Sequence, residues 1–185
     1  MTENAQTSAN PAPLGLLGFG MTTVLLNLAN AGVISLSSVI IAMGLTMGGL
    51  GQIIAGIMAY KKGDTFGATA FSAYGLFWWS LVFILVGPFK QIAAADGAGM
   101  GFYLLLWAVF TGFMFVGTLK HNRSSQLVFG SLTILFVLLA AGNFSGIAVI
   151  HTIAGWEGIL CGSFAIYASL AQAVNNEYGK KVLPL

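Results

Sequence analysis

Residues 126–147 read QLVFGSLTILFVLLAAGNFSGI, and this stretch decides the fold class. It contains no charged residue and is long enough to cross the apolar part of a bilayer as a helix, which takes about 20 residues. A membrane barrel would be built from alternating segments of about 10 residues instead. The stretch barely alternates, so it predicts a transmembrane helix.

The composition of the whole chain agrees with this interpretation. Of its 185 residues, 57% are hydrophobic and 6% are charged. Soluble domains carry about a quarter charged residues, so this chain could not cover a water-exposed surface. Its net charge of +2 is too small to indicate nucleic acid binding. We therefore expect a multi-pass protein whose partner is membrane lipid, without nucleic acid.

Short charged or turn-rich breaks divide the chain into six apolar runs. The predicted spans are 14–33, 36–59, 66–87, 98–118, 126–147 and 152–173. They form one six-helix transmembrane domain over residues 14–173, between tails at 1–13 and 174–185. The sequence therefore predicts an all-α membrane protein with no separate soluble domain.

The lysines and arginines are distributed unevenly about these spans. With six spans, both termini and the second and fourth loops share one side of the membrane. That side holds Lys61, Lys62, Lys120, Arg123, Lys180 and Lys181, and the other holds only Lys90. Basic residues accumulate in cytoplasmic loops. We therefore expect both tails to be cytoplasmic.

The first span begins with the string Asn-Pro-Ala-Pro-Leu-Gly-Leu at residues 10–16. Asn10 is a good helix cap, and proline suits the first helical turn. The free N–H groups of Ala12, Leu14 and Gly15, together with the helix dipole, could attract an anion. The alternative is that the string only stiffens the start of the helix at the membrane surface.

Polar residues follow one face of the first span. Phe19, Thr23, Asn27 and Asn30 are spaced so that they form a single stripe on a helix. Amides and hydroxyls are costly against lipid, so we expect the stripe to face protein or water. Two roles remain open for it, hydrogen bonding between helices and lining of a pathway.

The next two spans carry a small-residue groove and a group of aromatic residues. The groove is a packing face formed by Gly44, Gly48, Gln52 and Gly56. The aromatic residues Tyr74, Trp78 and Trp79 lie near mid-span, away from the interfaces where such residues usually gather. We expect them to fill the protein interior or to narrow a path.

The last two spans contribute Asn143 and Glu157. Glu157 is the only acid assigned within a span, which makes it a functional candidate by default. The alternative places it in the solvated interface at the start of the last helix. We expect His151, in the turn before that helix, to be a solvated loop residue.

The sequence also lacks residues that several other classes of membrane protein need for their function. Cys161 is the only cysteine, and no span contains an interior lysine, arginine or histidine. There is no catalytic motif, so we expect no enzyme, no metal and no cofactor. The polar stripes favour a transporter or a channel. The alternatives are a pore for ammonium or small neutral solutes and a non-transporting structural protein.

These motifs together resemble the acetate uptake transporter family, also called the succinate–acetate permeases. The resemblance starts with Asn-Pro-Ala-Pro-Leu-Gly-Leu and Gly18–Thr23. It continues through Tyr60–Gly63, Thr65–Gly67, Thr69–Phe71, Tyr74-Gly75, Phe115–Lys120, Gly142-Asn143 and Ala154–Trp156. It covers nearly the whole chain.

The resemblance implies a six-helix subunit in a homohexamer, with one pathway for acetate and related carboxylates, such as succinate, in each subunit. It implies a constriction of Phe19, Tyr74 and Leu132, and an effect of Ala165 on substrate choice. Beside these, the residues themselves suggest Asn10, Thr23, Asn27 and Asn143 as anion contacts. A carboxylic acid is almost wholly ionised at neutral pH. The pathway in the cell membrane must therefore pass the anion or deliver a proton with it, and Glu157 is the candidate proton site.

Overall fold

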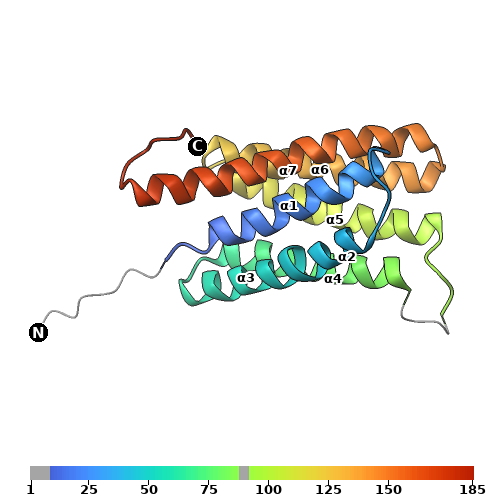
Figure 1. The fold of residues 1–185 in the computed structure, drawn as a ribbon, viewed down its shortest axis with the longest axis horizontal. Coiled ribbons are helices and arrows are strands. Elements are labelled where there is room, and N and C mark those ends of the chain that lie inside the picture. The colour runs from blue at the N-terminus through green and yellow to red at the C-terminus, as the bar shows by residue number, and fades with distance from the viewer. Residues whose placement is uncertain (1–8, 88–91) are drawn as a thin grey trace, which may run out of the picture.

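The computed structural model describes residues 9–87 and 92–185, and it forms a bundle of helices (Figure 1). The elements in chain order are α1 (Ala12–Asn30), α2 (Ser38–Met43), the π-helix η1 (Gly44–Gly51), α3 (Gln52–Lys61), α4 (Thr65–Val86), α5 (Gly97–Thr118), α6 (Arg123–Ser145) and α7 (Ala148–Glu177). The elements α2, η1 and α3 form one continuous span, Ser38–Lys61. Within the described residues, six helices are thus long and apolar enough to cross a membrane.

The six-helix prediction is confirmed, and the largest difference lies in the last helix. Predicted over 152–173, it spans Ala148–Glu177 in the structure. Gly146 adopts a left-handed conformation with φ of 68°, which ends α6 and lets α7 begin two residues later. His151 therefore lies in the first turn of α7. The prediction that it is a loop residue was wrong.

Helices α4, α5 and α6 each begin at an N-cap residue whose side chain accepts a backbone N–H. Asp64 accepts from Gly67 at 2.8 Å, Asp96 from Gly99 at 2.6 Å and Asn122 from Ser125 at 2.9 Å. Each bond satisfies an N–H that the first turn leaves unpaired. These caps fix where α4, α5 and α6 begin after their connecting turns.

Helix α1 occupies a central place in the bundle. It packs most extensively on α7 and also contacts η1 and α3, so it lies between α7 and the second span (Figure 1). Helix α6 contacts both α5 and α7, and α3 packs on α4. The polar stripe of α1 is consequently turned towards the interior.

The π-helix interrupts the second span where two tryptophans of α4 pack. Trp79 donates its Nε1–H to the Leu45 carbonyl at 3.0 Å, and the Trp78 ring is buried against Gly48. Thr22 of α1 donates to the Gly18 carbonyl at 2.8 Å and lies 3.4 Å from the Met43 carbonyl. Side chains of α1 and α4 thus bond backbone groups in and beside η1, a kind of segment that often occurs at functional sites.

The chain after α7 folds back along that helix. Asn175 accepts the N–H groups of Val182 and Leu183 at 2.7 and 2.8 Å, and Tyr167 donates to the Pro184 carbonyl at 2.9 Å. Lys90 and residues 1–8 of the predicted tail lie outside the described residues.

Candidate functional site: two pockets along the bundle

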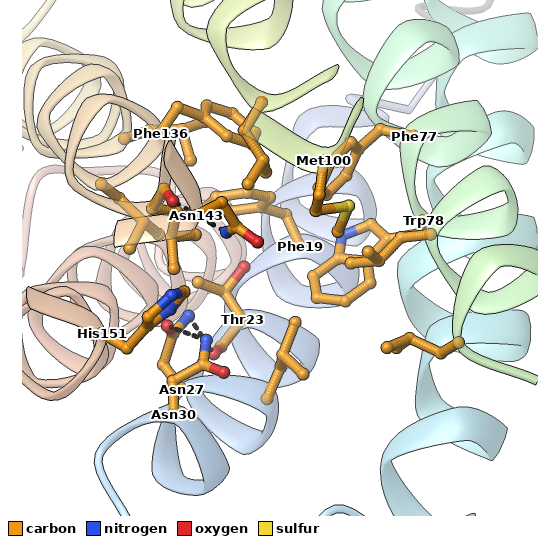
Figure 2. A pocket seen from close by; sticks show the side chains of 17 residues that line it. Phe19, Thr23, Asn27, Asn30, Phe77, Trp78, Met100, Phe136, Asn143 and His151 are labelled. Atoms are coloured by element: carbon orange, nitrogen blue, oxygen red, sulfur yellow. Dashed lines mark hydrogen bonds between the residues drawn. The ribbon is translucent and has the colours of Figure 1, made fainter. Parts of the chain in front are cut away.

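A large pocket opens at the end of the bundle away from the C-terminus. Its volume is about 210 Å³, and side chains of α1, α4, α5, α6 and α7 line it. Most of these side chains are leucine, phenylalanine, tryptophan or methionine, with a few amides and one hydroxyl among them (Figure 2). Such a mainly apolar hollow with few polar groups is typical of a small-molecule site.

A small pocket lies further along the bundle, towards the termini. Its volume is about 20 Å³, enough for about one water molecule. Leu16, Gln52, Ala70, Phe71 and Val128 are among the residues that line it. Two hollows of the bundle therefore follow one another along its length.

Phe19 and Leu132 line both pockets and separate them. Tyr74 lines the small pocket beside them, with its ring centroid 6.0 Å from that of Phe19. All three are nearly inaccessible, with exposed fractions of 5%, 2% and 3%. The Tyr74 hydroxyl is 2.9 Å from the Thr111 hydroxyl, which fixes the ring. The structure thus brings together the three residues of the expected constriction.

The polar stripe of α1 lines the large pocket along its whole length. Asn27 donates to the Thr23 carbonyl at 2.9 Å, and Asn30 donates to the Asn27 side-chain oxygen at 3.0 Å (Figure 2). These bonds lie within α1 and not between helices. A Cβ at Gly158 of α7 would overlap the Asn27 amide, so glycine there is what lets Asn27 fit. The geometry therefore favours the lining role for the stripe.

Two buried hydrogen-bonding groups of the large pocket are unpaired. The Thr23 hydroxyl and the Trp78 Nε1–H have no hydrogen-bond partner in the part of the chain that the structure describes. Figure 2 shows the Trp78 ring nitrogen on the pocket side. Unpaired buried polar groups are costly, which suggests that a solute or water completes them. The sequence predicts only that the Trp78 ring fills the interior or narrows a path, because residue spacing does not show which hydrogen bonds are missing.

His151 also lines the large pocket, beside the amides of α1 and α6. Figure 2 shows its ring directed towards Asn143, Asn27 and Asn30. A Cβ at Gly142 would lie 2.9 Å from the His151 Nε2 atom, so the ring packs in the space that this glycine leaves. Asn143 donates to the Leu139 carbonyl at 2.8 Å and lines the pocket from α6.

Gln52 is a second residue whose position beside a pocket is not apparent from the sequence. The expected packing face is buried, but Gln52 also lines the small pocket. Its Nε2 donates to the Gly48 carbonyl at 2.8 Å, while its Oε1 is buried without a partner among the described residues. It therefore presents a hydrogen-bond acceptor on the far side of Phe19 and Leu132.

Three expected site residues line neither pocket. Ala165 is fully buried within the hydrophobic core. Asn10 accepts the Ala12 N–H at 3.1 Å and donates to Gln172 of α7 at 3.2 Å. Glu157 is half-buried, with one carboxyl oxygen buried and unpaired within residues 9–87 and 92–185.

The start of α1 offers less to an anion than its sequence suggests. Of the three free N–H groups expected there, that of Ala12 is taken by Asn10 and that of Gly15 by the Pro11 carbonyl at 3.2 Å. Ser169 of α7 donates to the Pro13 carbonyl at 2.6 Å. These bonds tie the string to α7, while its anion contact stays a prediction.

Six apolar helices around two successive pockets define a multi-pass membrane protein with a solute-sized interior. The chain belongs to the GPR1/FUN34/yaaH family, whose model matches residues 1–184. The resemblance identified from the motifs is thereby confirmed.

Comparison with individual proteins agrees with this assignment. The chain is 55% identical to the "Succinate-acetate/proton symporter SatP" of Escherichia coli (strain K12), over 96% of this chain and 95% of that protein. It is 36% identical to "Ammonia transport outward protein 2" of Saccharomyces cerevisiae (strain ATCC 204508 / S288c), over 88% of this chain and 61% of that protein. The fold matches "Structure of the bacterial acetate channel SatP" with a TM-score of 0.93 and 55% identity, covering 96% of this chain and 98% of the other. These relatives are named as transporters or channels.

Proposed function

We propose that this protein carries acetate and related small carboxylates across the cell membrane, through the two pockets of its own subunit. The observation that carries the proposal is the arrangement of the pockets on either side of Phe19 and Leu132, with polar groups in the large pocket. The bacterial relatives named for acetate and succinate transport support the choice of solute.

Apart from the His151 ring, the hydrogen-bond donors that line the large pocket and contact the carboxylate are neutral. The buried Trp78 Nε1–H and Thr23 hydroxyl have no partner among the described residues, and the Asn27 and Asn143 amides line the same pocket. Neutral donors bind an anion less tightly than a lysine or arginine would. Weak binding suits a pathway, because each site must release what it takes.

The constriction then selects solutes by size. Phe19, Tyr74 and Leu132 present apolar surfaces between the pockets, and a small methyl-bearing solute passes them more easily than a larger one. Ala165 acts indirectly, since it belongs to the same buried core as these three residues and a larger side chain there would displace its neighbours. Beyond the constriction, Gln52 offers an acceptor to the solute or to its water.

The test is uptake of labelled acetate into proteoliposomes that contain the purified protein, with and without a pH gradient. We expect uptake that exceeds that of protein-free liposomes. We also expect unlabelled acetate and succinate to inhibit this uptake. Absence of protein-dependent flux would contradict the proposal and favour a structural role.

Ammonium or ammonia is the second candidate solute. The yeast relative named as an ammonia transport protein favours it, and the pocket amides carry oxygens that accept hydrogen bonds from ammonium as well. Competition in the same assay separates the two. If ammonium inhibits the labelled uptake and unlabelled acetate does not, the acetate proposal is overturned.

The assembly belongs to the proposal too. We place both tails, 1–13 and 174–185, in the cytoplasm because of the uneven lysines and arginines. Six copies form the homohexamer that the motif resemblance implies, and lipid covers the remaining apolar surface. The mass of the purified particle, measured by light scattering after subtraction of detergent, tests the number of copies.

A further inference from the structure

The large pocket contains one titratable side chain among the residues that line it, and this is His151. Its ring lies within a group of amides from α1 and α6, at the end of the pocket opposite the constriction. The hydrogen bonds of the described residues include none made by this ring, so neither of its nitrogens is bonded to the protein there. Gly142 leaves the space that the ring occupies.

We propose that His151 takes up the proton that accompanies the carboxylate, and that its charged form binds the anion together with Asn27 and Asn143. This inference rests on the proposed transport of carboxylates. Imidazole is the side chain that changes its charge between pH 5 and 8 in its ordinary state. Protonation of His151 gives the pocket the cation that its other lining residues lack.

The energetic reason is the cost of bringing an anion into a mainly apolar hollow. A carboxylate that leaves water loses strong hydration, and neutral donors replace only part of it. An imidazolium a few ångströms away compensates much more, because charges interact strongly where little water lies between them. Proton and carboxylate then enter the pocket as a pair with no net charge.

The pair also explains how a charged solute passes the apolar constriction. The proton moves from the imidazolium nitrogen to a carboxylate oxygen, so that an N–H bond breaks and an O–H bond forms. The neutral acid passes Phe19 and Leu132, and neutral His151 is recharged from water at the mouth. One proton thus crosses with each carboxylate.

Few other charged groups lie near His151 on the elements packed against it. Helix α1 carries no titratable residue, and α6 carries only Arg123 at its opposite end. Helix α7 carries Glu157 further along, and Asp96 caps α5 next to Gly97, which abuts the Asn143 carbonyl. Neither acid lines the large pocket, so His151 is better placed than Glu157 to exchange a proton with the solute.

The test compares variants in two measurements on the full-length protein. The first is the acetate concentration that half-saturates uptake into proteoliposomes, at about pH 5.5 and about pH 8. The second is the number of protons taken up when acetate binds the detergent-purified protein, from titration calorimetry in two buffers of different ionisation enthalpy. The variants are His151→Gln and Gly142→Ala, which displaces the ring but keeps the imidazole.

In the wild type, we expect the half-saturating concentration to be lower at the acidic pH and acetate binding to take up protons. His151→Gln should show no difference between the two pH values and no proton uptake. Gly142→Ala should weaken binding mainly at the acidic pH. His121→Gln is the matched control, because His121 lines neither pocket. Its ring packs edge-on against Phe66, with the ring centroids 4.9 Å apart.

Several results would overturn the inference. Wild-type pH dependence and proton uptake in His151→Gln would do so while leaving carboxylate transport intact. The inference would also be overturned if Glu157→Gln lost both the pH dependence and the proton uptake while His151→Gln kept them. That result would assign the proton to Glu157. If a His151 variant does not fold, wild-type pH dependence in Gly142→Ala would equally overturn the role of the ring. Absence of acetate flux in the wild type overturns the proposed function itself.

Discussion

Leu132 is the residue of the constriction whose shortening has the simplest expected effect. It lies between the two pockets with an exposed fraction of 2%, so removing its branched end joins them. Leu135, one turn further along α6, is equally buried but lines only the large pocket. Shortening Leu132 and Leu135 in turn therefore distinguishes the effect of a wider passage from that of a weakened core.

We expect Leu132→Ala to raise uptake of lactate and succinate relative to acetate, because larger solutes then pass. Leu135→Ala should leave this ratio unchanged. Both variants lose about 2–5 kcal/mol of stability, since each removes buried methyl groups. Competition for labelled acetate uptake measures the ratio. An unchanged ratio in both Leu132→Ala and Phe19→Ala would place the size filter elsewhere.

Trp78 is the buried donor that the sequence did not reveal. Trp78→Phe keeps an aromatic ring and removes the Nε1–H, so acetate loses one hydrogen bond. A bond to a charged group contributes about 1.5–3 kcal/mol, which corresponds to a rise of about tenfold or more in the half-saturating acetate concentration. Trp79→Phe is the control, because its Nε1–H bonds the Leu45 carbonyl outside both pockets. Equal effects of the two changes would contradict the assignment.

At the scale of the helices, the contact between α1 and α7 positions the polar stripe. Gly158 of α7 faces the Asn27 amide, and a methyl group there would overlap it. The two helices therefore need a small residue at position 158, and the contact with Gly158 fixes the position of the Asn27 amide.

Gly158→Ala should destabilise the protein by about 1–3 kcal/mol, the usual cost of extra volume in a packed core. It should also impair acetate uptake, because Asn27 has to move. Gly112→Ala in α5 is the control, since its nearest neighbour would be Thr133 at 3.9 Å. Alanine also favours helix over glycine, so Gly112→Ala should be neutral or stabilising. Thermal unfolding in detergent measures both, and an equally stable Gly158→Ala variant would refute the packing argument.

At the scale of the whole molecule, the order of the helices places the Lys61–Asp64 turn, residues 119–122 and the C-terminus at one end of the bundle (Figure 1). The large pocket opens at the other end, near the start of α7. The proposed orientation therefore makes the large pocket face the outside and the small pocket the cytoplasm.

Single cysteines test this orientation in a Cys161→Ala background. We expect an impermeant thiol reagent to label Ala94→Cys in sealed cells, and Lys61→Cys and Lys120→Cys only after permeabilisation. These positions are exposed and keep the helix caps and the positive-φ glycine at 63 intact. The reverse labelling pattern would invert the topology and place the large pocket in the cytoplasm.

The sequence by itself determined the class, the six spans and the stripe on α1. Apolar runs of this length with almost no charge are accommodated in lipid as spanning helices. The 3.6-residue period of a helix places Phe19, Thr23, Asn27 and Asn30 on one face. The family motifs added Tyr74 and Leu132 to Phe19. Each of these conclusions depends on local spacing or on a matching string.

Only the tertiary structure decided what meets across helices. It extended α7 so that His151 lines the large pocket, paired Asn10 with Gln172, and left Glu157 outside both pockets. It also showed the Trp78 nitrogen and the Gln52 oxygen to be unpaired among the described residues. Hydrogen-bond partners and cavities depend on the rotation and separation of neighbouring helices, which glycines such as Gly142 and Gly158 set through close approach. A linear pattern does not contain that geometry.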